Sequence, residues 1–104
     1  MSVLSITFHC PKDNLEAWSQ YVDDELIVLA ENLLDVNNYI LSEVQSDYIE
    51  EGKNYNLLLI FDDSNLREDF IKSELENIAE RIENKFGQDI MIFNTFLDPI
   101  KSKM

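Results

Sequence analysis

Tyr-Asn-Leu-Leu-Leu-Ile-Phe, residues 55–61, is a nearly continuous apolar run between two stretches of turn-forming residues. Glu50-Glu51-Gly52-Lys53-Asn54 precedes it and Asp62-Asp63-Ser64-Asn65 follows it. The length of the run and its flanks favour a strand over a short helix. Because a strand that is apolar at successive positions has both faces covered, we expect it inside a sheet and not at an edge.

Three further segments are predicted to be strands. Residues 3–10 alternate between a buried and a more polar face and end before Pro11. The buried face consists of Leu4, Ile6 and Phe8, and the polar face of Ser5, Thr7 and His9. Residues 39–48 are predicted to form an exposed edge strand, with Gly52 supplying the positive φ of the hairpin turn that follows. Residues 90–97 are apolar on both faces, like residues 55–61.

Two segments have helical periodicity. In the first, Asp13 and Glu16 resemble a capping box, and apolar residues recur at steps of three and four along about twenty residues. This stripe consists of Leu15, Trp18, Val22, Leu26, Leu29 and Leu33. The second helix is predicted to begin at Asp63 or Ser64 and to end at Gly87. Its stripe consists of Leu66, Phe70, Ile71, Leu75, Ile78, Ile82 and Phe86.

The order strand, helix, strand, strand, helix, strand predicts a fold of the α+β class. It is typical of the ferredoxin-like βαββαβ arrangement, a four-stranded antiparallel sheet with two helices on one face. We expect residues 1–104 to form a single domain of this kind.

Two helices cover only one face of such a sheet, so the other face should expose apolar residues. In residues 55–61 and 90–97, both the odd- and the even-numbered positions are largely apolar, so one apolar set of each strand must face away from the helices. The exposed apolar surface that results is larger than a soluble monomer usually has. We therefore predict a homodimer that packs sheet on sheet, as in dimeric α/β barrels. Its face should include either Met91, Phe93 and Leu97 or the alternating set Ile90, Ile92 and Phe96. A monomer whose tail covers this face is the alternative.

Composition excludes several functions. The chain has 21 acidic and 8 basic residues, a net charge of -13, so nucleic acid and anionic membranes are unfavourable partners. One cysteine, Cys10, allows neither an internal disulfide nor a thiolate zinc site. The start lacks a basic leader, and no apolar run reaches membrane-spanning length, so a cytoplasmic protein is expected.

The chain resembles an uncharacterised bacterial family of about this length, known as a domain of unknown function. The similarity is carried by Ile6-Thr7-Phe8 with Leu15-Glu16-Ala17-Trp18, by the Tyr55-led strand, and by Lys85-Phe86-Gly87-Gln88-Asp89 before Phe93, Thr95 and Leu97. The resemblance implies a ferredoxin-like fold of dimeric-barrel type. Family members carry a His-Ile-Pro step in the first helix, where this chain has Glu25-Leu26-Ile27-Val28.

Few residues suggest catalysis. His9 is the only histidine and neighbours Cys10, but adjacent residues of a strand point to opposite faces, so we read Cys10 as a buried apolar side chain. His9 could bind or protonate a ligand on the outer face, or be a satisfied histidine at a strand end. Candidates for the same pocket are Thr7, His9, Glu43 and Asn94, with Gln45 and Thr95 as alternatives on the same two strands, because the sequence does not determine which face of these strands lies beside His9. No metal-ligand spacing is present, and the 2 glycines allow no phosphate-binding loop, so we expect no cofactor.

Two functions of different class fit these observations. The first is a non-catalytic homodimeric module that binds a small apolar ligand or a protein. The alternative is a cofactor-free α/β-barrel enzyme, monooxygenase- or isomerase-like, in which an apolar pocket desolvates an aromatic substrate and His9 acts as acid or base. A scaffold whose role is dimerisation itself is a third reading.

Overall fold

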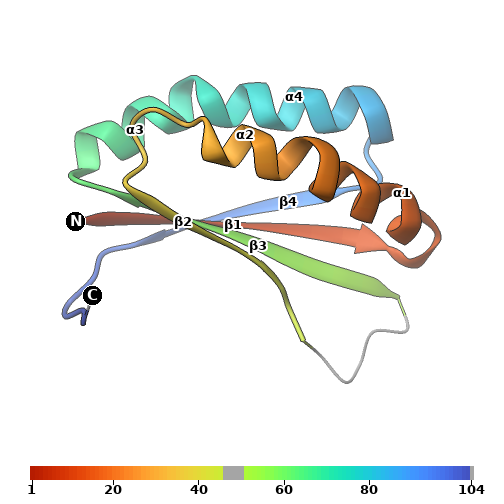
Figure 1. Cartoon of the computed structure of the whole chain (residues 1–104), viewed down its shortest axis with the longest axis horizontal. Helices are drawn as coiled ribbons and strands as arrows, with labels where there is room; N and C mark the ends of the chain where they lie inside the picture. Colours follow the sequence, from red (N-terminus) through yellow and green to blue (C-terminus); the bar gives the residue numbers. More distant parts are fainter. Residues whose placement is uncertain (46–50, 104) are drawn as a thin grey trace.

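The computed structural model describes residues 1–45 and 51–103, and within these ranges four strands form one antiparallel sheet (Figure 1). The strands are β1 (Ser2–Pro11), β2 (Asn38–Glu43), β3 (Gly52–Phe61) and β4 (Met91–Leu97), in the spatial order β2-β3-β1-β4. Both helical segments lie on the same side of the sheet. The predicted ferredoxin-like fold is therefore confirmed, with β1 and β3 in the centre.

The apolar run at 55–61 forms most of β3, which begins three residues earlier than predicted, at Gly52. It pairs with β1 from Pro11↔Gly52 to Ser2↔Phe61 and with β2 on its other side. Its position inside the sheet agrees with the prediction. Leu57 and Leu59 are fully buried beneath the helices, whereas Leu58 on the opposite face is only partly buried. The helices thus cover one face of the central strands, and no helix covers the other face.

The first helical segment is continuous but changes its winding. It consists of the 3₁₀ helix η1 (Lys12–Asn14), α1 (Leu15–Tyr21), the π-helical turn η2 (Val22–Leu26) and α2 (Ile27–Glu31). The predicted capping box is wrong, because Asp13 lies inside η1 and the cap residue of α1, Asn14, makes no side-chain cap bond.

The π-helical turn explains which side chains of this segment reach the core. Trp18, Val22, Leu26 and Ala30 are all buried and follow each other at steps of four. In an α-helix each such step rotates by about 40°. The wider π-helical turn absorbs this drift and keeps the four residues facing the sheet. The predicted continuation through Leu29 and Leu33 is less accurate, because both are only partly buried.

The second helical segment consists of α3 (Ser64–Lys72) and α4 (Glu74–Phe86), with an interruption at Ser73 that the sequence pattern did not predict. Asp63 caps α3 as expected, since its Oδ1 accepts a hydrogen bond from the Leu66 backbone N–H at 2.9 Å. Gly87 ends α4 with a φ of 65°, also as expected.

Trp18 is the centre of the core between helices and sheet. Its side chain is fully buried, with ring centroids 5.5 Å from Phe8 and Tyr21, 5.6 Å from Phe86 and 6.1 Å from Tyr55. Aromatic pairs at such distances add to the free energy gained by burial alone. The space between the sheet and the helices is therefore filled by the protein's own side chains at this end.

Arg67 fastens α3 to the sheet. Its Nη1 donates hydrogen bonds to the carbonyl oxygens of Val3 at 3.0 Å and Leu97 at 3.2 Å, and it pairs with Asp98 at 3.1 Å. The guanidinium also lies 5.3 Å from the ring centre of Phe96. One nearly buried charge thus joins the ends of β1 and β4 to the helix above them.

We expect Arg67→Ala to lower the free energy of unfolding by about 2 to 3 kcal/mol, because it leaves the Val3 and Leu97 carbonyls without their charged donor. Asp98→Asn should cost less than about 1 kcal/mol, since the Asp98 side chain is 81% exposed. Urea denaturation of both variants tests the prediction, and equal losses would show that the ion pair, not the carbonyl contacts, matters.

Gly52 is predicted to resist substitution more strongly than Gly87. A Cβ at Gly52 would lie 2.1 Å from the Cys10 carbonyl oxygen, and the residue has a φ of +147°. A Cβ at Gly87 would meet no atom within 4 Å. Gly52→Ala should therefore destabilise by more than about 2 kcal/mol and Gly87→Ala by about 1 kcal/mol in thermal or urea unfolding. Similar losses at both positions would contradict the close β1–β3 approach.

Candidate functional site: the open face of the sheet

The face of the sheet opposite the helices is the candidate site, and we call it the open face. Directly opposed residues of antiparallel strands share a face, so the register with the helix-covered Leu4, Ile6 and Phe8 assigns every strand position. The open face consists of Val3, Ser5, Thr7 and His9 from β1, Asn38, Ile40 and Ser42 from β2, Asn54, Asn56, Leu58 and Ile60 from β3, and Met91, Phe93, Thr95 and Leu97 from β4.

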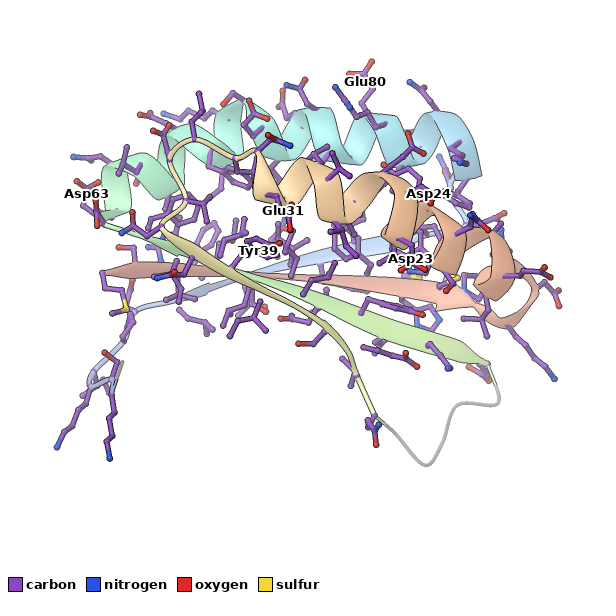
Figure 2. The ribbon with its side chains drawn as sticks, viewed as in Figure 1. Asp23, Asp24, Glu31, Tyr39, Asp63 and Glu80 are labelled. Atoms are coloured by element: carbon purple, nitrogen blue, oxygen red, sulfur yellow. The ribbon has the colours of Figure 1, made fainter. Side chains whose placement is uncertain are left out.

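The open face contains no aspartate, glutamate, lysine or arginine, although 28% of the chain is charged. The charges gather in the helices and loops instead. Figure 2 shows the labelled acids Asp23, Asp24, Glu31 and Glu80 on the helical side of the sheet. Charge depletion of this kind is typical of the core of a protein interface.

Two hydrogen-bonded groups hold the polar centre of the open face in place. The Asn56 side-chain amide donates to Ser5 Oγ at 2.7 Å and to Thr7 Oγ1 at 3.2 Å. His9 Nδ1 lies 2.6 Å from Asn54 Oδ1. Since Oδ1 can only accept, this contact has the ring hydrogen on Nδ1 and leaves Nε2 of a neutral ring as an acceptor.

Large apolar side chains flank this polar centre. Met91 is 51% exposed, Phe93 50%, Leu97 42% and Ile40 54%. The structure therefore places all three dimer-face candidates, Met91, Phe93 and Leu97, on one exposed face. The alternative set points the other way: Ile92 and Phe96 register with Phe8 and Leu4 on the helix-covered side.

The structure brings two of the four pocket candidates together and separates the other two. Thr7 and His9 lie on the open face. Glu43 and Asn94 do not, because Glu43 is opposite Tyr55 and Asn94 is opposite Ile6, both on the helix-covered face. Their inclusion with His9 was wrong. Glu43 instead forms an ion pair with Lys53 at 2.7 Å.

Asn54 and Asn56 are the site residues that sequence reasoning missed. Both contact predicted site residues directly: Asn54 contacts His9, and Asn56 donates a hydrogen bond to Thr7. The alternation of residues along the central strand β3 could have identified them. Asn54 and Asn56 alternate with Tyr55 and Leu57, so they had to share a face opposite to the core.

Cys10 lies on the opposite side of β1 from His9. Its side chain is fully buried, and burial raises the pKa of the thiol to about 11. Sγ donates to the Pro11 carbonyl oxygen at 3.4 Å. A thiol with this pKa is protonated at neutral pH, so the His9–Cys10 neighbourhood does not form a nucleophile and base pair.

No group of three or more His, Cys, Asp or Glu side chains within residues 1–45 and 51–103 is placed to hold a metal ion. Within the same ranges, no helix combines the length and the apolar character that crossing a bilayer requires.

The sheet order and the one-sided helices define an α+β protein of ferredoxin-like fold. The chain belongs to the family described as Domain of unknown function (DUF4286), whose sequence profile matches residues 1–100. This agrees with the resemblance seen in the sequence. No curated protein matches the chain.

Solved structures of similar fold have low sequence identity. A dimeric ferredoxin-like protein from an uncultured marine organism is 12% identical, with a TM-score of 0.67 over 100% of this chain and 99% of that chain. HapK from Hahella chejuensis is 7% identical, with a TM-score of 0.68 over 100% and 97%. A candidate antibiotic biosynthesis monooxygenase from Deinococcus radiodurans is 10% identical, with a TM-score of 0.63 over 100% and 99%. At these identities the similarity concerns the fold alone.

The Cys10 thiol is expected to react slowly in the folded protein. With a pKa of about 11, its thiolate fraction at pH 8 is about a hundredfold below that of an ordinary cysteine. Labelling with a chromogenic disulfide at pH 8, in buffer and in denaturant, measures the difference. Rapid labelling of the native protein would show that Cys10 is accessible and activated.

Proposed function

We propose that this chain is a non-catalytic cytoplasmic module that forms a homodimer through its open face and binds a small apolar ligand or a protein. The observation that carries the proposal is the open face itself: no charged side chain, a polar centre with hydrogen bonds between its own side chains, and exposed Met91, Phe93 and Leu97 at its flank. Met and aromatic residues with few charges are what distinguishes an interface core from other surfaces.

Electrostatics favour this face as the contact between two copies. Each chain has a net charge of -13, so most surfaces of one copy repel the other. Stacked sheets lie ~10 Å apart and a helix is ~10 Å thick, so joined open faces would hold the acidic helix layers roughly 30 Å apart. That separation exceeds the Debye length of ~8 Å at physiological ionic strength.

The polar centre is compatible with burial at such an interface. Asn56 already donates to Ser5 and Thr7, and Nδ1 of His9 already contacts Asn54. Buried polar groups are costly when they lack partners, and these bring partners of their own. Thr7 and His9 would then lie near the seam, where a small apolar ligand could lie between the flanking side chains.

Two further observations support the proposal. Dimeric ferredoxin-like proteins occur among the structures with this fold. Cys10 is a free thiol, which fits a reducing compartment such as the cytoplasm.

The enzyme reading has one observation in its favour. The His9 Nδ1 contact leaves Nε2 as an acceptor on the open face, where it could take a proton from a bound substrate. Against it, Trp18 and Phe8 are fully buried between the sheet and the helices, with ring centroids 5.5 Å apart, and occupy the space that a substrate would need there. Native mass spectrometry separates the readings: chemical conversion of a co-purified aromatic molecule by the wild-type protein, but not by His9→Asn, would favour the enzyme, whereas binding without conversion would favour the module.

Phe93→Asp should convert the dimer to monomer, because it places a charge within an otherwise uncharged contact. Phe96→Asp is the matched control: it is on the same strand and 58% exposed, but it faces Arg67 on the helix-covered side. We expect the control to keep the parental molar mass in light scattering coupled to size-exclusion chromatography. A Phe93→Asp protein that remains a dimer, or a wild-type protein that is monomeric, would overturn the open-face interface.

A further inference from the structure

A groove runs across the helix layer, on the other side of the molecule from the open face. Its main part is a cleft of about 470 Å³ between the first helical segment and α4, and a cleft of about 210 Å³ continues it past the α3–α4 interruption at Ser73. Asn32, Leu33 and Glu74 line both clefts, so they form one continuous surface. We call it the interhelical groove.

The groove has an apolar lining that the monomer does not cover. Val28 is 53% exposed and Leu34 is 97% exposed, and both line the groove beside the partly buried Leu29 and Leu33. Among the described residues, the remaining exposed large apolar side chains lie on the sheet or near the chain ends: Met1, Ile40, Val44, Met91, Phe93, Phe96, Leu97 and Ile100. The helix layer thus exposes its apolar residues at this one surface.

Acidic side chains border the same lining. Five acids line the groove, against a single base, Arg81: Asp24, Glu25, Asp35, Asp69 and Glu74. Glu25 contacts Lys85 at 3.3 Å. The other four acids take part in none of the three ion pairs formed within residues 1–45 and 51–103. The groove therefore combines apolar contact area with five acidic side chains against one basic side chain.

We propose that the interhelical groove binds a basic amphipathic helix of a partner protein. A helix that lies between two others packs its apolar residues against both, at positions i, i+3, i+4 and i+7. Its apolar side would contact Val28, Leu33 and Leu34, and lysines or arginines beside that stripe would meet the acidic borders. The helix layer of a second copy is a poor occupant, because the acids that it carries have the same sign as those of the groove.

This inference is independent of the homodimer. The open face and the groove share no residue, so variants at one surface leave the other intact. Binding of the basic helix to the groove should also weaken as the salt concentration rises, because salt screens the attraction between exposed charges.

The test uses a fluorescent helical peptide of about 18 residues, with leucines at the i, i+3, i+4, i+7 positions and lysines elsewhere, and a second peptide with glutamate in place of lysine. Fluorescence anisotropy with the full chain should give a Kd of about 10 μM or tighter for the lysine peptide at low salt. The glutamate peptide should not bind.

Matched variants decide whether the groove is the site. Asp35→Lys with Glu74→Lys should weaken binding at least about tenfold. Glu76→Lys with Glu80→Lys makes the same change in net charge at two exposed α4 positions outside the groove, and should weaken it less than about threefold. Val28→Ser alters the apolar lining without changing any charge, and should also weaken binding at least about threefold.

Three outcomes would overturn the proposal. The first is absence of binding by the lysine peptide to the wild-type chain. The second is an equal loss in the two charge-reversed proteins, which would mean that the peptide senses only net charge. The third is unchanged binding by Val28→Ser, which would remove the apolar contact. Val28→Ser is informative even if Glu74→Lys disturbs the start of α4, because it leaves that helix unaltered.

Discussion

The ten-residue antiparallel pairing of β1 with β3 is the constraint on which the rest of the structure depends. It runs from Ser2↔Phe61 to Pro11↔Gly52, and each of its pairs assigns two side chains to one face. A slip by one residue would move the whole apolar set of a strand to the opposite face. The register therefore decides that Leu4, Ile6 and Phe8 meet the helices, and that Asn54, Asn56 and His9 do not. The close approach of Gly52 to the Cys10 carbonyl at the end of the ladder is part of the same pairing.

From this pairing follows a separation of charge between the two sides of the molecule. The strands carry their charged residues, Glu43 and Lys53, on the helix-covered face, and the helices carry most of the others. A protein with a net charge of -13 gains solubility from the helix layer. The same arrangement leaves the open face as a surface where a like-charged copy could approach without repulsion between adjacent groups. Solubility and self-association are thus compatible because they use opposite faces.

Much of the fold could be predicted because local patterns and tertiary packing agree in it. Alternation in β1, the apolar stripe of α4 and the turn residues around β3 each predict the structure that is found. The π-helical turn η2 and the interruption at Ser73 could not be predicted, because both adjust helix phase to the packing and leave no composition signal. The hairpin turn predicted at residues 50–54 is wrong in its second half, because Gly52, Lys53 and Asn54 already belong to β3 and pair with β1. Gly52 does have the positive φ that was expected, whereas Glu50 and residues 46–48 of the predicted edge strand lie outside the described residues.

The candidate site was harder to predict than the fold. β4 is apolar at alternate positions on both sides, so its sequence favours neither face, and only pairing with β1 shows that Phe93 is opposite Thr7. The choice between Asn94 and Thr95 was left open for the same reason, and Thr95 is the one on the open face, opposite Ser5. Glu43 was misplaced because the parity of β2 depends on its register with β3. Identity of a polar residue is visible in a sequence, but the face on which it lies is a property of the whole sheet.

The two proposed surfaces together restrict how an assembly could be built. Joined open faces would leave one interhelical groove on each outer side of the dimer, facing away from each other, because the helices lie opposite the open face in each copy (Figure 1). A short basic helix could therefore occupy one groove at a time, with no gain in affinity from the second. A partner would gain avidity only if it carried two such helices on a linker long enough to pass around both layers, since a linker that cannot span two sites adds nothing. The geometry accordingly favours a dimer that recruits two separate partner molecules over one that clamps a single partner.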